Sequence, residues 1–353
     1  MEEQNNNDNE PLKPTFSMPP ESQTDEVNKT DSYKFKRNLI IILIIIGIIL
    51  IAIALIVIIR YYLFNYIEVK YYIENPGKET LLFNESFIEY IKSIKINGAP
   101  SDINNVHVFD NPGIYTVKIK FKEKLKIIDR FFFKVKSIKS VDLSHFFSDK
   151  IKTTSEMFSG CSNLINVKFE QFFTNKIYNI SNMFSGCSSL TSIDLNGLKY
   201  NTLKDIYGLF SGCKQLTSFN FTFFNWTGVV NASNLFRDCS SLKVMNASFE
   251  TNLNTQNLVY MAGMFQNCSA LEFLDLSSFD TKNLIDASYL LNGCKNLRSI
   301  NFSRFNASKL LKYENIFNGL PDSGELIYNS KIFKQEIIDL LPGNWTTEDT
   351  ENL

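Results

Sequence analysis

The longest apolar segment of the chain lies near its N-terminus, where Leu39 to Ile59 form 21 consecutive uncharged residues. As a helix rising 1.5 Å per residue, this run would extend about 31 Å, close to the roughly 30 Å hydrocarbon core of a bilayer. It is too long for the apolar stretch of a cleaved signal peptide, and 38 residues precede it. The pattern therefore predicts an uncleaved transmembrane signal-anchor helix over residues 38–60.

The charges on either side of this segment predict its orientation. Four Lys or Arg residues lie between positions 29 and 37, whereas Arg60 and Lys70 are the positive residues that follow closely. Because segments rich in Lys and Arg stay in the cytosol, the N-terminus is predicted to be cytosolic and the C-terminal part to lie outside the cell or in a lumen. Residues 1–37, rich in Asn, Pro and acidic side chains, are predicted to be a disordered cytosolic tail.

Further along the chain, apolar positions recur with a 26-residue period. Six cysteines follow one another at gaps of 26, 26, 26, 29 and 26 residues. Each has Leu three positions later, and Phe, or Leu in the last copy, three positions earlier. Unrelated sequence would not keep this phase, so the pattern predicts one structural unit repeated in register. The predicted core of the repeat is Cys161, Cys187, Cys213, Cys239, Cys268, Cys294, Leu164, Leu190, Leu216, Leu242, Leu271 and Leu297.

Each copy has two halves with different periodicity. Leu190, Ile193 and Leu195 show the spacing of a leucine-rich-repeat strand, in which residues two apart point inward. The other half, such as Asn179–Cys187, has apolar residues at steps of three and four, which predicts a short helix on the convex side. The predicted fold class is an α/β repeat solenoid, leucine-rich-repeat-like, with parallel strands and short helices. It would cover residues 125–328 and end in a C-terminal cap and tail at 329–353.

The repeat also resembles a known family. The segments MFSGCSNL, MFSGCSSLTSIDL and MFQNCSALEFLDLSSFDT are similar to the BspA-like leucine-rich-repeat surface proteins. Their 26-residue type is carried by mycoplasmal and other bacterial surface proteins and by protists. The segment Tyr328–Trp345 resembles the sequence that often closes such arrays. The resemblance implies surface display and adhesion to, or recognition of, molecules on host or neighbouring cells.

Between the apolar segment and the repeats, residues 66–124 are predicted to form a small β-rich module. Tyr115, Val117, Ile119 and Phe121 alternate with polar residues directly after a turn at 111–113. This module is either an immunoglobulin-like spacer or a β-rich N-terminal cap of the repeats, and the spacer is favoured.

Charge and composition limit the partners and the catalytic or metal-binding chemistry that the chain can be expected to have. The net charge of -1 does not favour nucleic acid as a partner, and His107 and His145 are the two imidazoles of the chain. His145 has Asp142 and Ser144 nearby, but closeness in sequence does not arrange a catalytic triad. We predict no enzyme and no cofactor, because histidines are scarce and neither a Gly-rich phosphate loop nor H-E-x-x-H occurs. We predict no metal site, because the cysteines lack the paired spacing of zinc ligands. They are expected to be buried thiols, with disulfides between neighbouring copies as the alternative.

Two sets of polar residues are candidate sites. One would form a mildly acidic stripe on the concave face, which either contacts a partner or is merely solvated. This set is Asp142, Lys168, Asp194, Asn220, Asn246, Asp275 and Asn301. The other set consists of candidate glycosylation sites in Asn-x-Ser/Thr triplets. These are Asn84, Asn179, Asn225, Asn231, Asn306 and Asn344.

Together these features predict a single-pass type II membrane protein at the cell surface, with an internal secretory membrane as the alternative location. Its repeats would serve adhesion or recognition of an extracellular protein or glycan. The alternative function is a structural surface-coat or secretory-pathway scaffold protein without a specific ligand.

Overall fold

The computed structural model of the protein describes residues 21–63, 65–169, 176–195, 203–221, 225–246 and 253–351. The contacts within the chain divide it into two compact units, Met1–Arg60 and Tyr61–Leu353. The first unit contains most of one long helix, and the second contains the small β-rich module, the repeats and the C-terminal segment.

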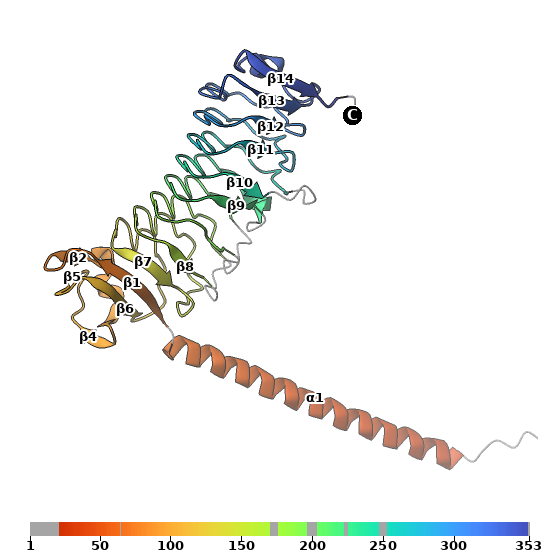
Figure 1. Ribbon diagram of the computed structural model, residues 1–353. Coiled ribbons are helices and arrows are strands. Elements are labelled where there is room, and N and C mark those ends of the chain that lie inside the picture. Colours follow the sequence, from red (N-terminus) through yellow and green to blue (C-terminus); the bar gives the residue numbers. More distant parts are fainter. Residues whose placement is uncertain are drawn as a thin grey trace, which may run out of the picture. The chain divides into compact units, whose positions relative to one another are not determined.

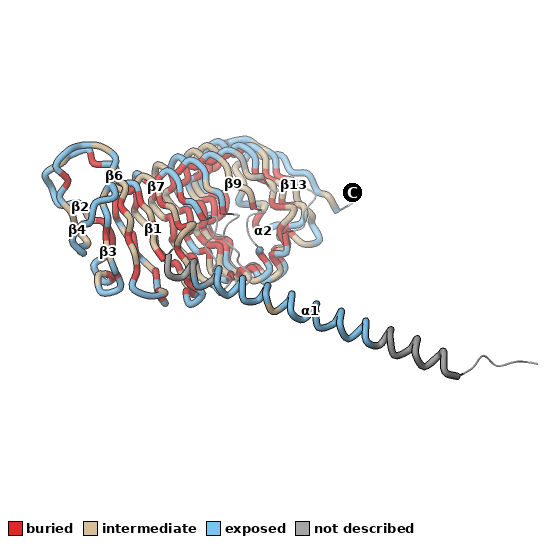
Figure 2. The backbone as a smooth tube through the Cα atoms, turned by 90° about the horizontal axis from the view of Figure 1, so that it is seen from below, coloured by how far each residue is buried: buried red, intermediate tan, exposed pale blue. Residues whose placement is uncertain are grey.

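The long helix α1 runs from Glu21 to Leu63 (Figure 1). Within it, the 24 residues Tyr33–Ile56 are long and apolar enough to cross a membrane. Their isoleucine and leucine side chains are exposed, and nearly all of this stretch has the colour of exposed residues in Figure 2. Such a surface is unfavourable in water but suits a lipid environment, so α1 is compatible with a membrane anchor or a signal sequence.

This helix begins earlier than the sequence pattern indicated. Residues 21–37 belong to α1, although a disordered tail was expected over residues 1–37. Once a helix is nucleated in a long apolar run, each added residue gains a backbone hydrogen bond, so the helix extends past the apolar limit. The remainder of the expected tail, residues 1–20, lies outside the described residues.

The second unit opens with the β-rich module. Four of its strands form an antiparallel sheet in the order β4-β3-β6-β1. They are β1 (Tyr66–Ile73), β3 (Ile91–Ile96), β4 (Ala99–Ser101) and β6 (Gly113–Phe121). The pair β2 (Glu79–Leu81) and β5 (Val106–Val108), with the 3-10 helix η1 (Glu85–Tyr90), completes the module. In β6 the alternating residues Val117, Ile119 and Phe121 are buried, as their spacing requires.

The sheet of the module continues directly into the repeats. The free edge of β1 pairs with β7 (Ile138–Asp142), and β7 pairs in parallel with β8 (Asn166–Lys168). The ring of Phe121 lies 5.3 Å from that of Phe146, so the two regions also share their core. A separate immunoglobulin-like spacer would keep a sheet of its own. Here the module covers the first repeat strand, in the manner of an N-terminal cap.

Successive copies of the repeat lie side by side (Figure 1). Strands β9 (Ser218–Asn220) and β10 (Val244–Asn246) pair in parallel, as do β11 (Phe273–Asp275) and β12 (Ser299–Asn301). A one-turn 3-10 helix, η3 (Trp226–Gly228), follows β9. On the other side of each copy, parallel bridges link equivalent residues one copy apart. These residues are Thr153, Asn179, Asp205, Asn231, Tyr260, Asp286 and Lys312.

The segment before each cysteine is not the short helix that the sequence predicted. In the first full copy, the N–H groups of Met157 and Cys161 bond to carbonyls three residues earlier, at 3.3 and 3.0 Å. Glu156 and Gly160 have φ values of 54° and 78°, which the third residue of a type II turn requires. Two consecutive turns therefore produce the three- and four-residue apolar spacing that a helix would also give.

Three further backbone donors of these turns bond to the next copy, and this excludes a helix. The N–H groups of Glu156, Phe158 and Gly160 donate to the carbonyls of Ser181, Met183 and Ser185, at 2.9, 2.9 and 2.7 Å. An α-helix would need those donors for its own carbonyls four residues back. The equivalent bonds recur at the following junctions of the array, so the turns form a continuous ladder along it.

The core of the array is a line of stacked aromatic rings. Phe132, Phe158, Phe184, Phe210, Phe236 and Phe265 stack in succession, with centroids 5.5, 5.4, 5.8, 5.8 and 5.9 Å apart. The last distance bridges the 29-residue gap, so the additional residues do not disturb the stack. The buried residues follow the inner side of the coiled chain (Figure 2).

The six cysteines form a second buried line beside these rings. All are free thiols with no exposed surface. Each Sγ donates to the carbonyl of the phenylalanine position in the preceding copy, at 3.0 to 3.2 Å. Burial raises the pKa of every one of these thiols above the ordinary value of 9.0, and raises that of Cys294 to about 12. The thiols thus act as small apolar residues that also donate a weak hydrogen bond.

The C-terminal segment closes the far end of the array. Strand β13 (Ser323–Tyr328) pairs in parallel with β12, and β14 (Asn344–Asp349) pairs in parallel with β13. The short helix α2 (Gln335–Ile338) connects them. The indole of Trp345 donates to the carbonyl of Pro321 at 2.9 Å. It also fills the space above Gly324, where a Cβ would come within 2.6 Å of the ring.

The buried thiols predict a loss of stability at alkaline pH. Their pKa is higher in the folded protein than in the unfolded chain, so their contribution is complete below about pH 9 and is lost as pH rises towards 12. For each thiol, the free energy of unfolding should fall by up to about 1.4 kcal/mol per pH unit above pH 9. Denaturant titrations from pH 7 to about pH 11 measure this slope. Cys213→Ala should make it shallower, and an unchanged slope in that variant would contradict the role of the thiol.

Candidate functional site

The outward side of the short strands is the candidate recognition surface. In β7, Val141 is buried and its neighbours Ser140 and Asp142 face outward, as strand alternation requires. The predicted stripe occupies the last position of each strand. The structure pairs Asp142 with Lys168, Asn220 with Asn246, and Asp275 with Asn301. Asp194 is exposed but does not belong to a strand in the described part of its copy, so the stripe is not one uniform sheet.

This face extends beyond the repeats into the module. One row of paired residues crosses five neighbouring strands. Lys95 in β3 lies opposite Lys118 in β6, which lies opposite Glu68 in β1. Glu68 lies opposite Asp142 in β7, which lies opposite Lys168 in β8. Residues directly opposite one another point to the same face of a sheet. The predicted stripe therefore continues into a row of charged residues that the sequence did not indicate. The alternating lysines of β6 were visible, but the pairing of β1 with β7 was not.

A hollow of about 860 Å³ lies on the module part of this face. Its lining includes Lys95, Lys118 and Glu68, together with Tyr66. The Lys118 ammonium lies 3.6 Å from the Glu68 carboxylate and 4.2 Å from the centre of the Tyr66 ring. The same ring also stacks on His145, with ring centroids 4.7 Å apart. A basic hollow with an aromatic side chain can take acidic or hydroxyl-rich groups of a partner.

Some side chains of the stripe also form hydrogen bonds with the backbone. The Oδ1 atoms of Asp142, Asp275 and Asn301 accept the N–H groups of Ser144, Ser277 and Ser303, at 2.8, 2.7 and 3.0 Å. Such Asx turns explain why Asp and Asn recur at the ends of the strands. The side chains that remain for contact lie beside them, and Phe273 in β11 is one, with 64% of its surface exposed.

The candidate glycosylation sites show the same turn. The Oδ1 atoms of Asn84, Asn179, Asn225, Asn231 and Asn306 accept the N–H two residues later, which belongs to the Ser or Thr of each triplet. Asn344 lies exposed at the start of β14. An Asx turn favours Asn followed by a short hydroxyl residue, so the triplets have a structural reason that requires no glycan. Glycosylation stays a prediction.

The Asp142, Ser144 and His145 grouping is local. The Ser144 hydroxyl and His145 Nδ1 are 3.1 Å apart, and Asp142 accepts the backbone N–H of Ser144. In a hydrolase triad the carboxylate would orient the imidazole. Within the described ranges, no group of three or more His, Cys, Asp or Glu side chains is placed to hold a metal ion. The absence of enzymatic, cofactor and metal chemistry stays a prediction.

Comparison with known families identifies the repeat region. A family model described as "Mycoplasma protein of unknown function, DUF285" matches residues 126–249 and again residues 220–330. The two matches together span 126–330, more than half of the 353 residues. The chain belongs to the DUF285 family. The DUF285 matches cover nearly the same residues as the predicted array and leave α1 and the module outside. Comparisons with curated proteins and with solved structures found no match.

The turn at Asn225 provides a test that separates backbone structure from glycosylation. Asn225 caps η3 by accepting the N–H of Thr227 at 3.1 Å. Asn225→Ala should lower the free energy of unfolding by about 1 kcal/mol, whereas Asn225→Asp keeps the acceptor and should change it by less than about 0.5 kcal/mol. Chemical denaturation measures both, and both variants lack the glycosylation triplet. Equal destabilisation by the two would exclude the turn as the reason for this asparagine.

Proposed function

We propose that this DUF285 protein is a single-pass type II membrane protein that displays a leucine-rich-repeat-like solenoid for adhesion or recognition. Its ligand would be an extracellular protein or glycan. The BspA-like resemblance belongs to the same proposal. The observation that carries it is the outward strand face, because paired strands of neighbouring copies hold the same position side by side on that face. Solenoid proteins use such surfaces to bind partners.

The composition of this face supports contact rather than simple solvation. It carries charged residues of both signs in the row from Lys95 to Lys168, and Phe273 is an exposed aromatic in the array. Aromatic residues are enriched at the centres of protein interfaces, so Phe273 is a candidate contact in its own part of the face, separate from the charged row. The apolar helix α1 supplies a means of holding this surface at a membrane.

The alternative, a structural coat or scaffold protein, has one observation in its favour. Strand β14 is the last strand of its sheet in the described residues, and an open strand edge can pair with another copy. However, β14 carries Glu348 and Asp349, both exposed. Repulsion between like charges disfavours pairing of this edge with itself. The edge therefore gives weaker support than the strand face gives to recognition.

The predicted orientation can be measured by protease protection on intact cells. Residues after Leu63 should be digested from outside, whereas an epitope added at the N-terminus should remain protected until the membrane is opened. This follows from the excess of positive charge before the apolar segment. Digestion of the N-terminal epitope on intact cells would contradict the type II orientation.

Recognition through the strand face can be tested with a matched pair of variants. Phe273 in β11 and Leu311, next to the bridging residue Lys312 on the other side of its copy, are both exposed, at 64% and 75%. In the full chain reconstituted in lipid nanodiscs, Phe273→Ser should weaken saturable binding to cells about tenfold, because a central aromatic contact is worth more than about 1 kcal/mol.

The matched variant Leu311→Ser should leave that affinity unchanged. Equal affinities for the parent and both variants would contradict the use of the strand face. Non-saturable binding together with self-association of the parent chain would instead favour the coat protein.

A further inference from the structure

Two lines of lysine side chains lie at the N-terminal end of the array. Lys124, Lys150 and Lys176 recur at 26-residue steps, and Lys126 and Lys152 recur in the same way two residues later. The backbone brings these copies side by side, since the carbonyl of Lys152 accepts an N–H group from the next copy at 3.0 Å. Hydrogen-bonded strands are about 4.8 Å apart, so the stack places like charges at short intervals.

Four of these lysines line one hollow beside Thr153, on the side of the array that carries the bridging residues (the loop side). The hollow measures about 550 Å³ and is lined by Lys126, Lys150, Lys152 and Lys176, together with Asp149. The four lysines are exposed. Within the described ranges, the ion pairs include no acidic partner for any of them.

The single carboxylate of the hollow is already paired. Lys124 Nζ lies 3.2 Å from Asp149 Oδ1. Burial raises the pKa of Asp149, but the hydrogen bond from Lys124, a backbone hydrogen bond and the charges of Lys124 and Lys176 outweigh this and hold it below its usual value. Asp149 is therefore ionised at neutral pH and paired with Lys124. The four lysines that line the hollow keep a surplus of positive charge.

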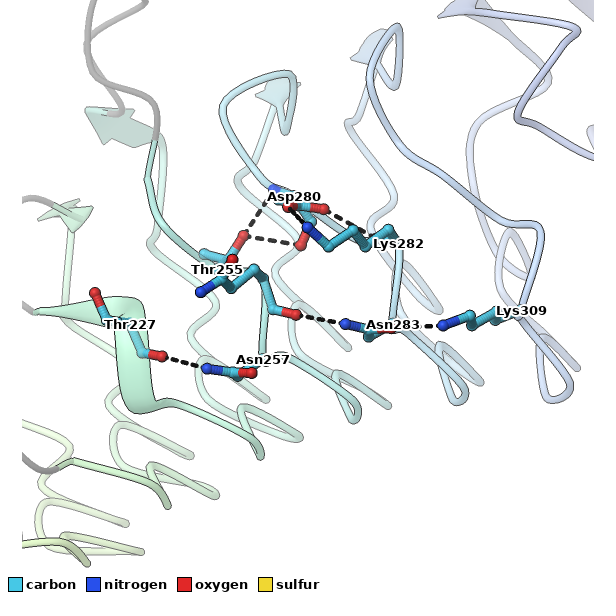
Figure 3. A network of polar contacts seen from close by, with 8 residues as sticks. Thr227, Thr255, Asn257, Asp280, Lys282, Asn283 and Lys309 are labelled. Atoms are coloured by element: carbon cyan, nitrogen blue, oxygen red, sulfur yellow. Dashed lines mark hydrogen bonds and ion pairs between the residues drawn. The ribbon is translucent and has the colours of Figure 1, made fainter.

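At the far end of the array, the side chains at equivalent positions form hydrogen bonds within the protein (Figure 3). There, Asn257, Asn283 and Lys309 occupy the line that Lys124, Lys150 and Lys176 occupy at the N-terminal end. Their side chains bond to the preceding copy, at 2.7 Å to Thr227 O, 2.8 Å to Gln256 O and 2.7 Å to Asn283 Oδ1.

The neighbouring lysine at this end is also neutralised, because Lys282 Nζ lies 3.0 Å from Asp280 Oδ2 (Figure 3). The lysine-lined hollow thus differs from the far end of the array, where the side chains at equivalent positions bond within the protein. Its unneutralised charge is available to an anion from outside.

We propose that the hollow lined by Lys126, Lys150, Lys152 and Lys176 binds a linear polyanionic glycan whose sulfate or carboxylate groups lie along successive copies. A line of cations at regular spacing fits a chain of repeated negative charges better than one small anion. The described lining contains no aromatic side chain on which the bases of a single-stranded nucleic acid could stack. This inference goes beyond the proposed function, because it concerns the loop side and not the strand face.

The test uses the full chain in nanodiscs of neutral phosphatidylcholine, with a heparin oligosaccharide as the polyanionic probe. The triple variant Lys150→Gln, Lys152→Gln, Lys176→Gln should bind it at least about tenfold more weakly. The slope of log affinity against log salt should also fall by about one for each lysine removed. The matched control Lys282→Gln, Lys309→Gln, Lys312→Gln removes the same charge from exposed positions at the far end. It should bind within about twofold of the parent chain.

Several results would overturn the proposal. These are equal losses in the two triple variants, no loss in the first, tighter binding of single-stranded DNA of equal charge, or binding to phosphatidylserine vesicles that heparin does not displace. Replacement of the same three lysines by arginine should restore binding, which distinguishes lost charge from lost folding. Phe273→Ser should bind heparin normally, so failure of this proposal and failure of recognition by the strand face give different results.

Discussion

The whole array depends on hydrogen bonds that pass from one copy to the next. At the first full junction, the donors of Glu156, Phe158 and Gly160 are satisfied by the neighbouring copy, and the strands and bridging residues add further bonds. A unit of 26 residues is too small to bury a core of its own, so its phenylalanine, cysteine and leucine are covered only when another copy lies on each side. The first and last copies lack a neighbour on one side, so other segments of the chain have to cover them. Strand β1 covers one end, and β14 adds the last strand at the other.

The same constraint decides what the surface looks like. Since equivalent positions are held about one strand spacing apart, any residue type that recurs in the sequence becomes a line on the protein. The line of Asx turns stabilises the ends of the strands, and the line eleven residues before the cysteine position is cationic in the first copies and amide-rich in later ones. The recurring polar residues of such an array are therefore of two kinds: some form Asx turns at the ends of the strands, and the others are available to contact a partner.

Features that depend on the repeat frame could be predicted from the sequence. The cysteine and leucine positions of the repeat are buried in the structure, and Asp142 pairs with Lys168 as the stacked register requires. Features that depend on local geometry or on distant pairing could not. Two type II turns and one helical turn give the same apolar spacing, so the spacing alone predicts a helix before each cysteine. Glu68 and Lys118 join the candidate surface only because β1 pairs with β7, about 70 residues away in the sequence. The net charge of -1 gives no sign of the lysine-lined hollow, because it sums the charges of the whole chain.

The stacking of Phe236 on Phe265 shows that a junction survives when three extra residues enter the loop between two cysteines. Every junction uses equivalent atoms, so removal of one complete copy would bring together two surfaces that already fit each other. Array length is then a variable that can change by whole copies, each adding about 4.8 Å between the two caps. Related proteins with more or fewer copies would differ in the distance between their two caps and keep the same ends and the same internal bonds.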